Sequence, residues 1–423
     1  MKYNIHTLHN GLRVVLVPML DAKTATVVVM AGTGSRYETK EENGLAHFLE
    51  HMFFKGTKNR PSARLISEEL DAIGSVYNAF TAKDRTAYYA KVSSKYLDTA
   101  LDVISDIFLN STLPGKEITK ERGAIIQEID MYEDMPMRII DNVFDELIFG
   151  GDHPLGRTIL GPKDNIRTFM RKDFANYLKH HYTPENTVVC VAGAISEQKV
   201  LDAINRSFGK VAKSPAPRFV PFASMQVSPR VAIKEKKTDQ TQLMLGVPSY
   251  PYAHKDEYVL EVLATILGGG MSSRLFLEVR EKRGLAYSVH ASVEKYPDTG
   301  YLAVQAGVEH GKLEKAITTI LAEFRKIKNV KVSDEELKKA KAHIKGTLAM
   351  ALETSDAVAA QAATSLISLG KIRTMEDITR GIDKVKASDV FRVAKDLLRT
   401  EGLNLAIIGP HLDREKFLSL LRA

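Results

Sequence analysis

Thr86-Ala87-Tyr88 is echoed 213 residues later by Thr299-Gly300-Tyr301, and each triplet stands just before a long stretch with the periodicity of an amphipathic helix. These two helical stretches also match each other, at an offset of 216 residues. The matching pairs are Leu97 with Leu313, Ala100 with Ala316, and Phe108 with Phe324. A repeat of about 210 residues is much longer than any solenoid period, so it indicates a duplicated domain.

The duplication predicts where the domains begin and end. A polar stretch with two prolines, Lys213-Ser214-Pro215-Ala216-Pro217-Arg218, lies between the copies and has the composition of a linker. We therefore predict an N-terminal domain over residues 1–212, a linker over 213–222 and a C-terminal domain over 223–423.

Strand-like and helix-like segments follow one another along the chain, which predicts an α+β fold. The expected strands of the first half are residues 12–17, 25–31, 86–92 and 187–192, and its expected helices include 97–109, 119–133 and 139–149.

The composition excludes several classes of protein. With 44% hydrophobic and 26% charged residues, the 423-residue chain is neither disordered nor fibrous. No apolar run approaches the roughly 18 residues of a membrane helix, so no membrane partner is expected. The net charge of +7 comes from well-mixed basic and acidic residues, and no basic stretch alternates with aromatics. We therefore expect no nucleic-acid binding.

The sequence also predicts a cellular compartment. Cys190 is the single cysteine and lies in a strand-like run, so it cannot form an intramolecular disulfide and is expected to be buried. The first residues, Met1-Lys2-Tyr3-Asn4-Ile5-His6, lack the order of a signal peptide. A reducing, cytoplasmic location is the expectation, unless the chain has already been processed.

The motif His47-Phe48-Leu49-Glu50-His51 carries the clearest chemical signal. On a helix, its two histidines lie about 40° and one turn apart, so both imidazoles can reach one metal ion. A helix is expected over residues 43–54, because its apolar positions form one stripe. This stripe consists of Leu45, Phe48, Leu49, Met52 and Phe53.

The start of this helix and the purpose of its polar side can both be inferred. Either Thr39 with Glu42, or Asn43 alone, has the sequence pattern of an N-cap. In the second half, His47, Glu50 and His51 fall opposite Glu261, Ala264 and Thr265. Folding therefore does not require the three polar residues, which favours a functional role for them.

A catalytic zinc usually has three protein ligands and one open position, so a third ligand is needed. Glu121 and Glu128 are seven residues apart and lie within about 20° of each other on a helix. One could be the ligand and the other its neighbour, but the pattern alone does not choose between them. Two ordinary exposed glutamates would give the same pattern.

Taken together, these residues resemble the zinc motif H-x-x-E-H of the pitrilysin-like (M16) metallopeptidases, in which a distal glutamate follows. The similarity includes residues 44–57, 78–81 and 127–134 and extends over essentially the whole chain. The length of the chain matches the short-subunit branch, which includes mitochondrial processing peptidase and its bacterial relatives. The resemblance implies two tandem homologous α/β-sandwich domains in an α+β chain, which agrees with the duplication.

The resemblance also implies a role for each residue. His47, His51 and Glu128 would bind one zinc ion per chain, and Glu50 would be the general base. Glu121 would support the ligands without binding the metal. Asn78 and Ala79 would lie on the edge strand that binds an extended peptide by β-augmentation.

The second half resembles the family in Arg280 and Tyr287, which would contact substrate carbonyl oxygens and the developing oxyanion. The glycine-rich stretch Gly268-Gly269-Gly270 precedes them, as in the second domain of the family. The family's heterodimers divide the zinc motif and this pair between two subunits. Because this chain carries both, we expect a homodimer that forms a clamshell chamber, with the active site completed in trans.

The sequence therefore predicts a zinc endopeptidase that hydrolyses extended peptides in an enclosed chamber. The acidic segment with Asp130, Glu133 and Asp134 suggests a preference for basic peptides, although a solvated helix end would have the same composition. Two alternatives remain open, which are a noncatalytic structural subunit of the same fold and a metal enzyme that is not a peptidase.

Overall fold

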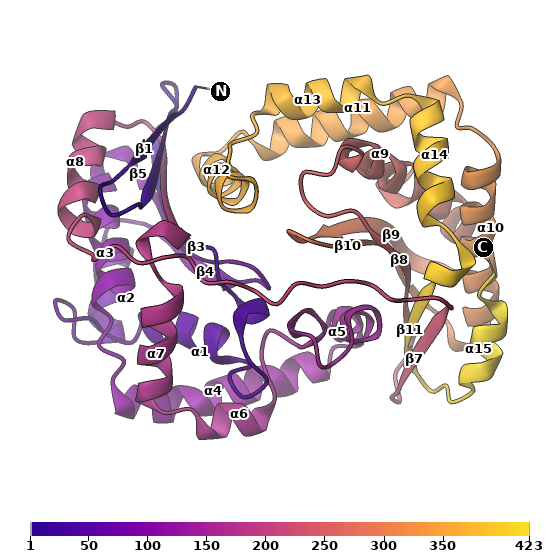
Figure 1. The fold of residues 1–423 in the computed structure, drawn as a ribbon, viewed down its shortest axis with the longest axis horizontal. Helices are drawn as coiled ribbons and strands as arrows, with labels where there is room; N and C mark the ends of the chain where they lie inside the picture. Colours follow the sequence, from indigo (N-terminus) through magenta and orange to yellow (C-terminus); the bar gives the residue numbers. More distant parts are fainter. Residues whose placement is uncertain (1, 423) are drawn as a thin grey trace. The chain divides into compact units, whose positions relative to one another are not determined.

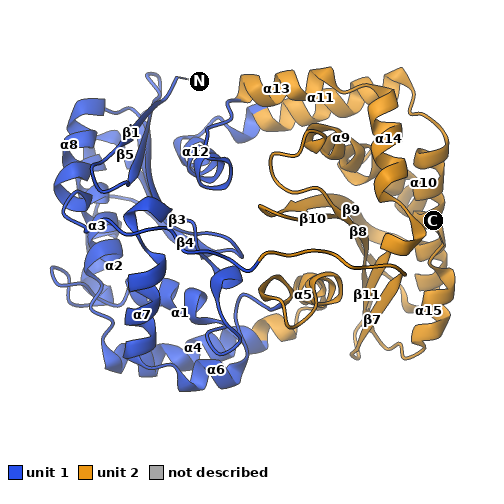
Figure 2. Cartoon of the chain, in the orientation of Figure 1, with its two compact units in different colours: residues 1–130, 157–220, 349–374 blue, residues 131–156, 221–348, 375–423 orange. Residues whose placement is uncertain are grey.

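The computed structural model describes residues 2–422, and the chain divides into two compact units (Figures 1 and 2). Unit 1 consists of the residues up to 130 together with 157–220 and 349–374. Unit 2 consists of 131–156, 221–348 and the residues from 375 onward. Each unit is therefore assembled from both halves of the sequence.

Unit 1 is built on one sheet with the strand order β1-β2-β6-β3-β5-β4. Its strands are β1 (Asn4–Thr7), β2 (Arg13–Pro18), β3 (Thr24–Ala31), β4 (Val76–Thr81), β5 (Thr86–Ser93) and β6 (Thr187–Gly193). The helices are α1 (Leu45–Phe53), α2 (Ala63–Ala72), α3 (Leu97–Asn110), α4 (Gly115–Glu133), α6 (Lys163–Thr168), α7 (Arg171–His181), α8 (Glu197–Phe208) and α12 (Ser355–Leu369). β2 and β6 are parallel, and all other neighbouring strands are antiparallel.

The sheet of unit 1 separates two hydrophobic cores, because successive side chains of a strand point to opposite faces. Along β3, Val27 and Val29 pack with α1 and α3, whereas Val28 and Met30 pack with α12. β3 is buried on both faces, which explains its nearly unbroken apolar sequence. β4 is the edge strand and alternates between exposed and half-buried residues.

Unit 2 is built on a five-stranded sheet with the order β7-β11-β8-β10-β9. Its strands are β7 (Arg230–Glu235), β8 (Thr241–Ser249), β9 (Ala286–Lys295), β10 (Gly300–Val308) and β11 (Asn404–Gly409). The helices are α5 (Pro136–Phe149), α9 (Glu257–Gly268), α10 (Leu313–Asn329), α11 (Asp334–Ala351), α13 (Met375–Lys384), α14 (Ala387–Leu397) and α15 (Arg414–Leu420), and a π-helical turn, η5, covers Phe276–Glu281.

The two units have the same topology, which confirms the duplicated α+β fold. The order β2-β6-β3-β5-β4 of unit 1 recurs as β7-β11-β8-β10-β9 in unit 2. In both sheets the first two of these strands are parallel and the remaining pairs antiparallel. α9 therefore occupies the place in unit 2 that α1 occupies in unit 1.

The repeats exchange one helix each (Figure 2). α5 belongs to the first repeat in sequence, but its apolar side packs on the sheet of unit 2. α12 belongs to the second repeat, but it packs on the sheet of unit 1. The boundaries proposed from the sequence, 1–212 and 223–423, stay a prediction for the two repeats, and the compact units are interleaved along the chain.

Most expected elements are present with ends that differ by at most two residues, but α4 begins four residues earlier than expected, at Gly115, and α5 three residues earlier, at Pro136. Residues 213–222 form neither helix nor strand. Cys190 is buried in β6, and burial raises the pKa of its thiol. Among residues 2–422, no helix combines the length and the apolar character needed to cross a membrane.

Candidate metal centre

The helix α1 presents two chemically different sides. The apolar stripe predicted from the sequence is entirely buried in the core of unit 1. Its polar positions lie on the other side, where His47 is buried and Glu50 and His51 are half-buried. A helix anchored in this way holds its polar side chains in fixed positions.

The start of α1 differs from the prediction. Thr39 and Glu42 do exchange hydrogen bonds, but they precede the helix, whose N-cap is Gly44. The first turn is capped instead by the buried carboxylate of Glu38, which accepts hydrogen bonds from the Gly44 and Ala46 N–H groups at 3.0 and 2.6 Å. Glu38 also accepts from the Asn43 side chain at 3.0 Å. Burial raises the pKa of Glu38 to about 7, and these donors oppose the rise.

Gly44 is required at this turn for two reasons. Its φ of 101° lies in the left-handed region, which is unfavourable for residues that carry a Cβ atom. A Cβ atom at this position would also lie 2.6 Å from the Leu160 carbonyl oxygen. The left-handed φ and the close contact together explain why a glycine occupies the N-cap position of α1.

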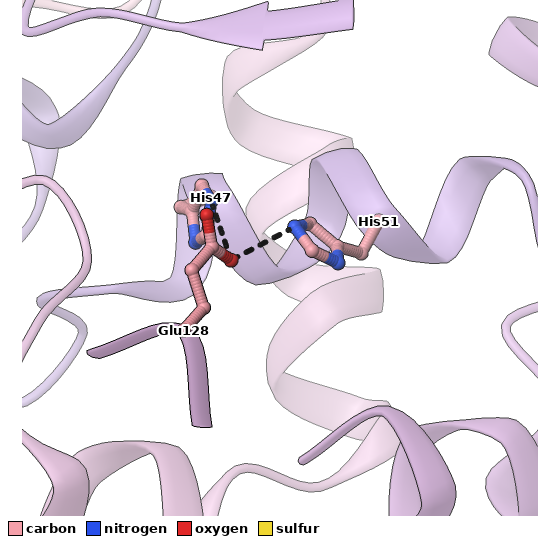
Figure 3. A group of neighbouring side chains, drawn as sticks. All are labelled: His47, His51 and Glu128. Atoms are coloured by element: carbon pink, nitrogen blue, oxygen red, sulfur yellow. Dashed lines mark ion pairs between the residues drawn. The ribbon is translucent and has the colours of Figure 1, made fainter. Parts of the chain in front are cut away.

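His47, His51 and Glu128 point toward one another (Figure 3). The Oε2 atom of Glu128, from α4, lies 3.7 Å from Nε2 of His47 and 3.6 Å from Nε2 of His51. Within residues 2–422 this is the one group of three or more such side chains arranged to hold a metal ion.

The donor set fits zinc. Two nitrogen or oxygen ligands of a tetrahedral zinc ion, each about 2.0–2.1 Å from the metal, lie about 3.3–3.4 Å apart. The distances of 3.6 and 3.7 Å therefore need only small side-chain adjustments. Two imidazoles and one carboxylate are also a ligand set that leaves one position open.

The pKa values of the three side chains are shifted in different directions, so the side chains differ in how readily they are deprotonated for metal binding. Burial, and then the neighbouring His51, lower the pKa of His47 to about 3, so its imidazole is neutral at pH 7. Although burial acts to lower the pKa of His51, the carboxylates of Glu121, Glu128 and Glu50 together raise it. Burial raises the pKa of Glu128. A ligand must be deprotonated to bind, so metal binding at this group would release protons.

Glu121 lies behind His51 and not in the ligand group. Its Oε1 accepts a hydrogen bond from Nδ1 of His51 at 2.9 Å, and its Oε2 lies 2.6 Å from Nζ of Lys55. Although burial acts to raise the pKa of Glu121, the contacts with His51 and Lys55 bring it to about 2. Glu121 is therefore ionised, and His51 must donate through Nδ1, which leaves Nε2 free to bind a metal.

Glu50 is held by the edge strand. The Thr81 hydroxyl, at the end of β4, donates to Oε2 of Glu50 at 2.5 Å. Burial raises the pKa of Glu50, and this hydrogen bond opposes the rise. Asn78 and Ala79 lie on the same strand, whose outer edge pairs with no strand among the described residues. The free strand edge and the Glu50 carboxylate are therefore linked through Thr81.

Arg280 and Tyr287 lie in unit 2, close to each other. The Arg280 guanidinium stacks against the rings of Tyr287 and Phe276, with centroid distances of 5.0 and 4.8 Å. The Tyr287 side chain is exposed on β9. The structure thus brings the half-buried Arg280 and the exposed Tyr287 together, in a different unit from the metal-binding group.

The acidic segment after Glu128 is partly paired. Lys163 forms an ion pair with Asp130. Lys236 donates to the Glu133 carbonyl group and lies 3.4 Å from the Asp134 carboxylate. These lysines reduce the local negative charge on which the predicted preference for basic peptides depends.

Three residues that contact the site or its helix were not predicted from the sequence, and these are Glu38, Lys55 and Thr81. Thr81 is 31 residues from the Glu50 carboxylate that it contacts. Glu38 precedes the motif and Lys55 follows it, and neither belongs to its pattern. A signal was present for Lys55, since it follows His51 by four residues, which is one helical turn.

Comparisons with known proteins give one consistent family. Residues 13–163 match the family model for insulinase (peptidase family M16), and residues 168–344 match the model for the peptidase M16 inactive domain. An uncharacterized zinc protease, YmxG of Bacillus subtilis, is 37% identical over 406 residues, which cover 96% of this chain and 98% of that protein. An uncharacterized zinc protease of Rickettsia felis is 35% identical and covers 97% and 98%.

Solved structures agree with these matches. The crystal structure of a protease from Helicobacter pylori superimposes with a TM-score of 0.89 at 28% identity and covers 97% of this chain and 99% of that chain. A chain of complex III2 from Candida albicans shares the fold, with a TM-score of 0.83 at 20% identity and 99% of each chain covered.

Proposed function

Because this chain belongs to peptidase family M16, we propose that it is a zinc-dependent endopeptidase in which His47, His51 and Glu128 bind one zinc ion per chain. The convergence of their donor atoms, which all lie within 4.8 Å of one another, carries the proposal. The relatives' description as zinc proteases supports both the metal and the reaction.

Glu50 is proposed as the general base. It lies on the same side of α1 as the two histidines but is not a member of the ligand group. Zinc, when bound, would supply Lewis acidity and lower the pKa of a bound water to about 7. Glu50 would take a proton from the attacking water and deliver it to the nitrogen of the leaving amine. Thr81 would hold the carboxylate in place during both transfers.

The remaining residues are proposed to bind and orient the peptide. The free edge of β4, with Asn78 and Ala79, would pair with an extended substrate. Arg280 and Tyr287 would donate hydrogen bonds to the substrate carbonyl and to the oxyanion that develops on it. Because they lie on the other unit, we propose that a homodimer encloses the peptide and completes each site in trans. A preference for basic peptides stays part of this proposal. Because lysines pair with Asp130 and Asp134, we expect this preference to be small.

A noncatalytic subunit of the same fold is the alternative. Its support is the match of residues 168–344 to the family's inactive-domain model. The ligand group and Glu50 all lie within residues 13–163, which match the insulinase model instead, and this favours the peptidase.

The test separates metal binding from catalysis. We expect about one zinc per chain by metal analysis, loss of zinc in His47→Ala and His51→Ala, and retention of zinc without peptide cleavage in Glu50→Gln. Cleavage is measured on a peptide library by mass spectrometry, with the Glu50→Gln protein as the control for contaminating proteases. Zinc loss in Glu50→Gln, or cleavage at the wild-type rate, would contradict the proposed roles of these residues. A zinc-loaded wild type that cuts no peptide would favour the noncatalytic alternative.

A further inference from the structure

Lys55 contacts neither the ligand group nor Glu50, but it completes a chain of contacts that ends at His51. Its ammonium group lies 2.6 Å from Oε2 of Glu121, and Oε1 of the same carboxylate accepts from Nδ1 of His51 at 2.9 Å. We propose that Lys55 is a positioning residue for the metal centre, which acts on His51 through Glu121 and strengthens zinc binding. This inference rests on the proposed function.

The geometry gives each oxygen of Glu121 one partner. The Glu121 side chain is 9% exposed, so water has little access to it, and an ionised oxygen without a partner would be costly there. If Lys55 were absent, Oε2 would lose its charged partner. The carboxylate would then gain by rotating toward another donor or toward solvent, which would release the hydrogen bond to His51.

The hydrogen bond to Glu121 determines the tautomer and the orientation of the His51 ring. A histidine that donates through Nδ1 has its Nε2 lone pair available for a metal, and the acceptor fixes the orientation of the ring. His47 has no such support, because its buried Nδ1 atom has no hydrogen-bond partner among the described residues. Within residues 2–422, the hydrogen bond from His51 to Glu121, which Lys55 supports, is therefore the one hydrogen bond that orients either histidine ring.

The position of Lys55 is itself fixed by the backbone. Lys55 follows α1 directly, and its N–H donates to the Met52 carbonyl at 3.1 Å. On the other side, the carbonyl of Gly56 accepts from the N–H of Thr112 at 3.0 Å. Lys55 thus lies four residues after His51, in the turn that follows α1, from which its ammonium group reaches Glu121.

The experiment measures the zinc dissociation constant by competition with a chelator, which does not depend on activity. Partners of metal ligands typically change metal affinity 10- to 100-fold when removed. We expect Glu121→Gln to fall in this range and Lys55→Met to weaken zinc binding by about tenfold. Lys55→Arg keeps the charge and should restore most of the affinity. The control is Lys91→Met, because Lys91 is similarly exposed and forms an ion pair of 2.7 Å with Asp356 away from the metal centre.

A double-mutant cycle distinguishes positioning from a general loss of structure. If Lys55 acts through Glu121, then Lys55→Met should weaken zinc binding by less than about twofold in a protein that already carries Glu121→Gln. An equal tenfold loss in both backgrounds, or unchanged affinity in Lys55→Met when the wild type binds zinc, would overturn the inference. A wild type that binds no zinc would instead overturn the proposed function and this inference with it. Melting of the zinc-free proteins shows whether any variant is unfolded.

Discussion

The hydroxyl group of Thr81 donates a hydrogen bond to the proposed general base. Its hydrogen bond to Glu50 is 2.5 Å long and joins a charged acceptor to a side chain on a different element. Thr81→Val keeps the shape of the side chain and removes the donor. We expect about a tenfold lower kcat with zinc content unchanged, since one hydrogen bond to a charged group is worth roughly 1.5 kcal/mol.

The matched control for this change is Thr81→Ser, which keeps the hydroxyl and loses only a methyl group. It should retain most of the activity, and for both variants kcat and KM are measured on one fluorescence-quenched peptide that the wild type cleaves. Equal losses in the two variants would mean that packing of the methyl group, and not the hydrogen bond, matters at this position.

At the scale of single residues, the sequence predicts which side chains of the site lie together only where they are close in the chain. His47 and His51 are one helical turn apart, so the helix period was sufficient to predict that both reach one metal ion. Glu128 reaches them from another helix, and pattern alone could not separate it from Glu121. The structure places the two glutamates on different sides of His51, and no spacing rule contains that information.

At the scale of elements, the cap of α1 can be tested. Glu38→Ala removes a buried acceptor and leaves the N–H groups of Gly44 and Ala46 without it. We expect a loss of about 2–4 kcal/mol in the free energy of unfolding, which corresponds to a decrease of about 5–10 °C in the apparent Tm of a unit of this size. The measurement is thermal unfolding followed by circular dichroism.

Thr39→Ala is the control for the cap, since it removes the exposed hydroxyl that accepts a hydrogen bond from the Glu42 N–H, a contact that the sequence suggested as the start of the helix. It should change the free energy of unfolding by less than about 0.5 kcal/mol. If the two variants have the same Tm, Glu38 is not the cap that stabilises α1.

At the scale of the whole molecule, the repeat was predictable and the exchange of helices was not. Matching residues at a constant offset predict a duplication, and the shared strand order confirms it. An amphipathic helix, however, shows which of its sides is buried and not which sheet buries it. Phe144 of α5 packs against Tyr301 of unit 2, and Ala363 of α12 lies in the core beside β3 of unit 1. Both contacts join residues that are far apart in sequence.

The proposed composite site also belongs to this scale. Tyr287 is 78% exposed, and the half-buried Arg280 guanidinium lies over its ring, so unit 2 leaves the Tyr287 hydroxyl available to an external ligand. In a two-fold dimer with sites completed in trans, each site uses the metal centre of one protomer and the Arg280–Tyr287 pair of the other. Tyr287→Phe should then lower turnover about 10²- to 10³-fold, as for other oxyanion donors, and leave zinc in place.

Mixing two inactive variants tests whether the site is shared between protomers. In a heterodimer of Glu50→Gln with Tyr287→Phe, one site carries both changes and the other carries neither. Random pairing makes half of the dimers mixed, each with one intact site of two, so activity should rise to about a quarter of the wild-type value. The control mixes Glu50→Gln with His47→Ala, because both changes affect the metal centre and every site in that heterodimer is damaged. If both mixtures stay inactive although subunit exchange is demonstrated by mass spectrometry, then Tyr287 acts within its own protomer.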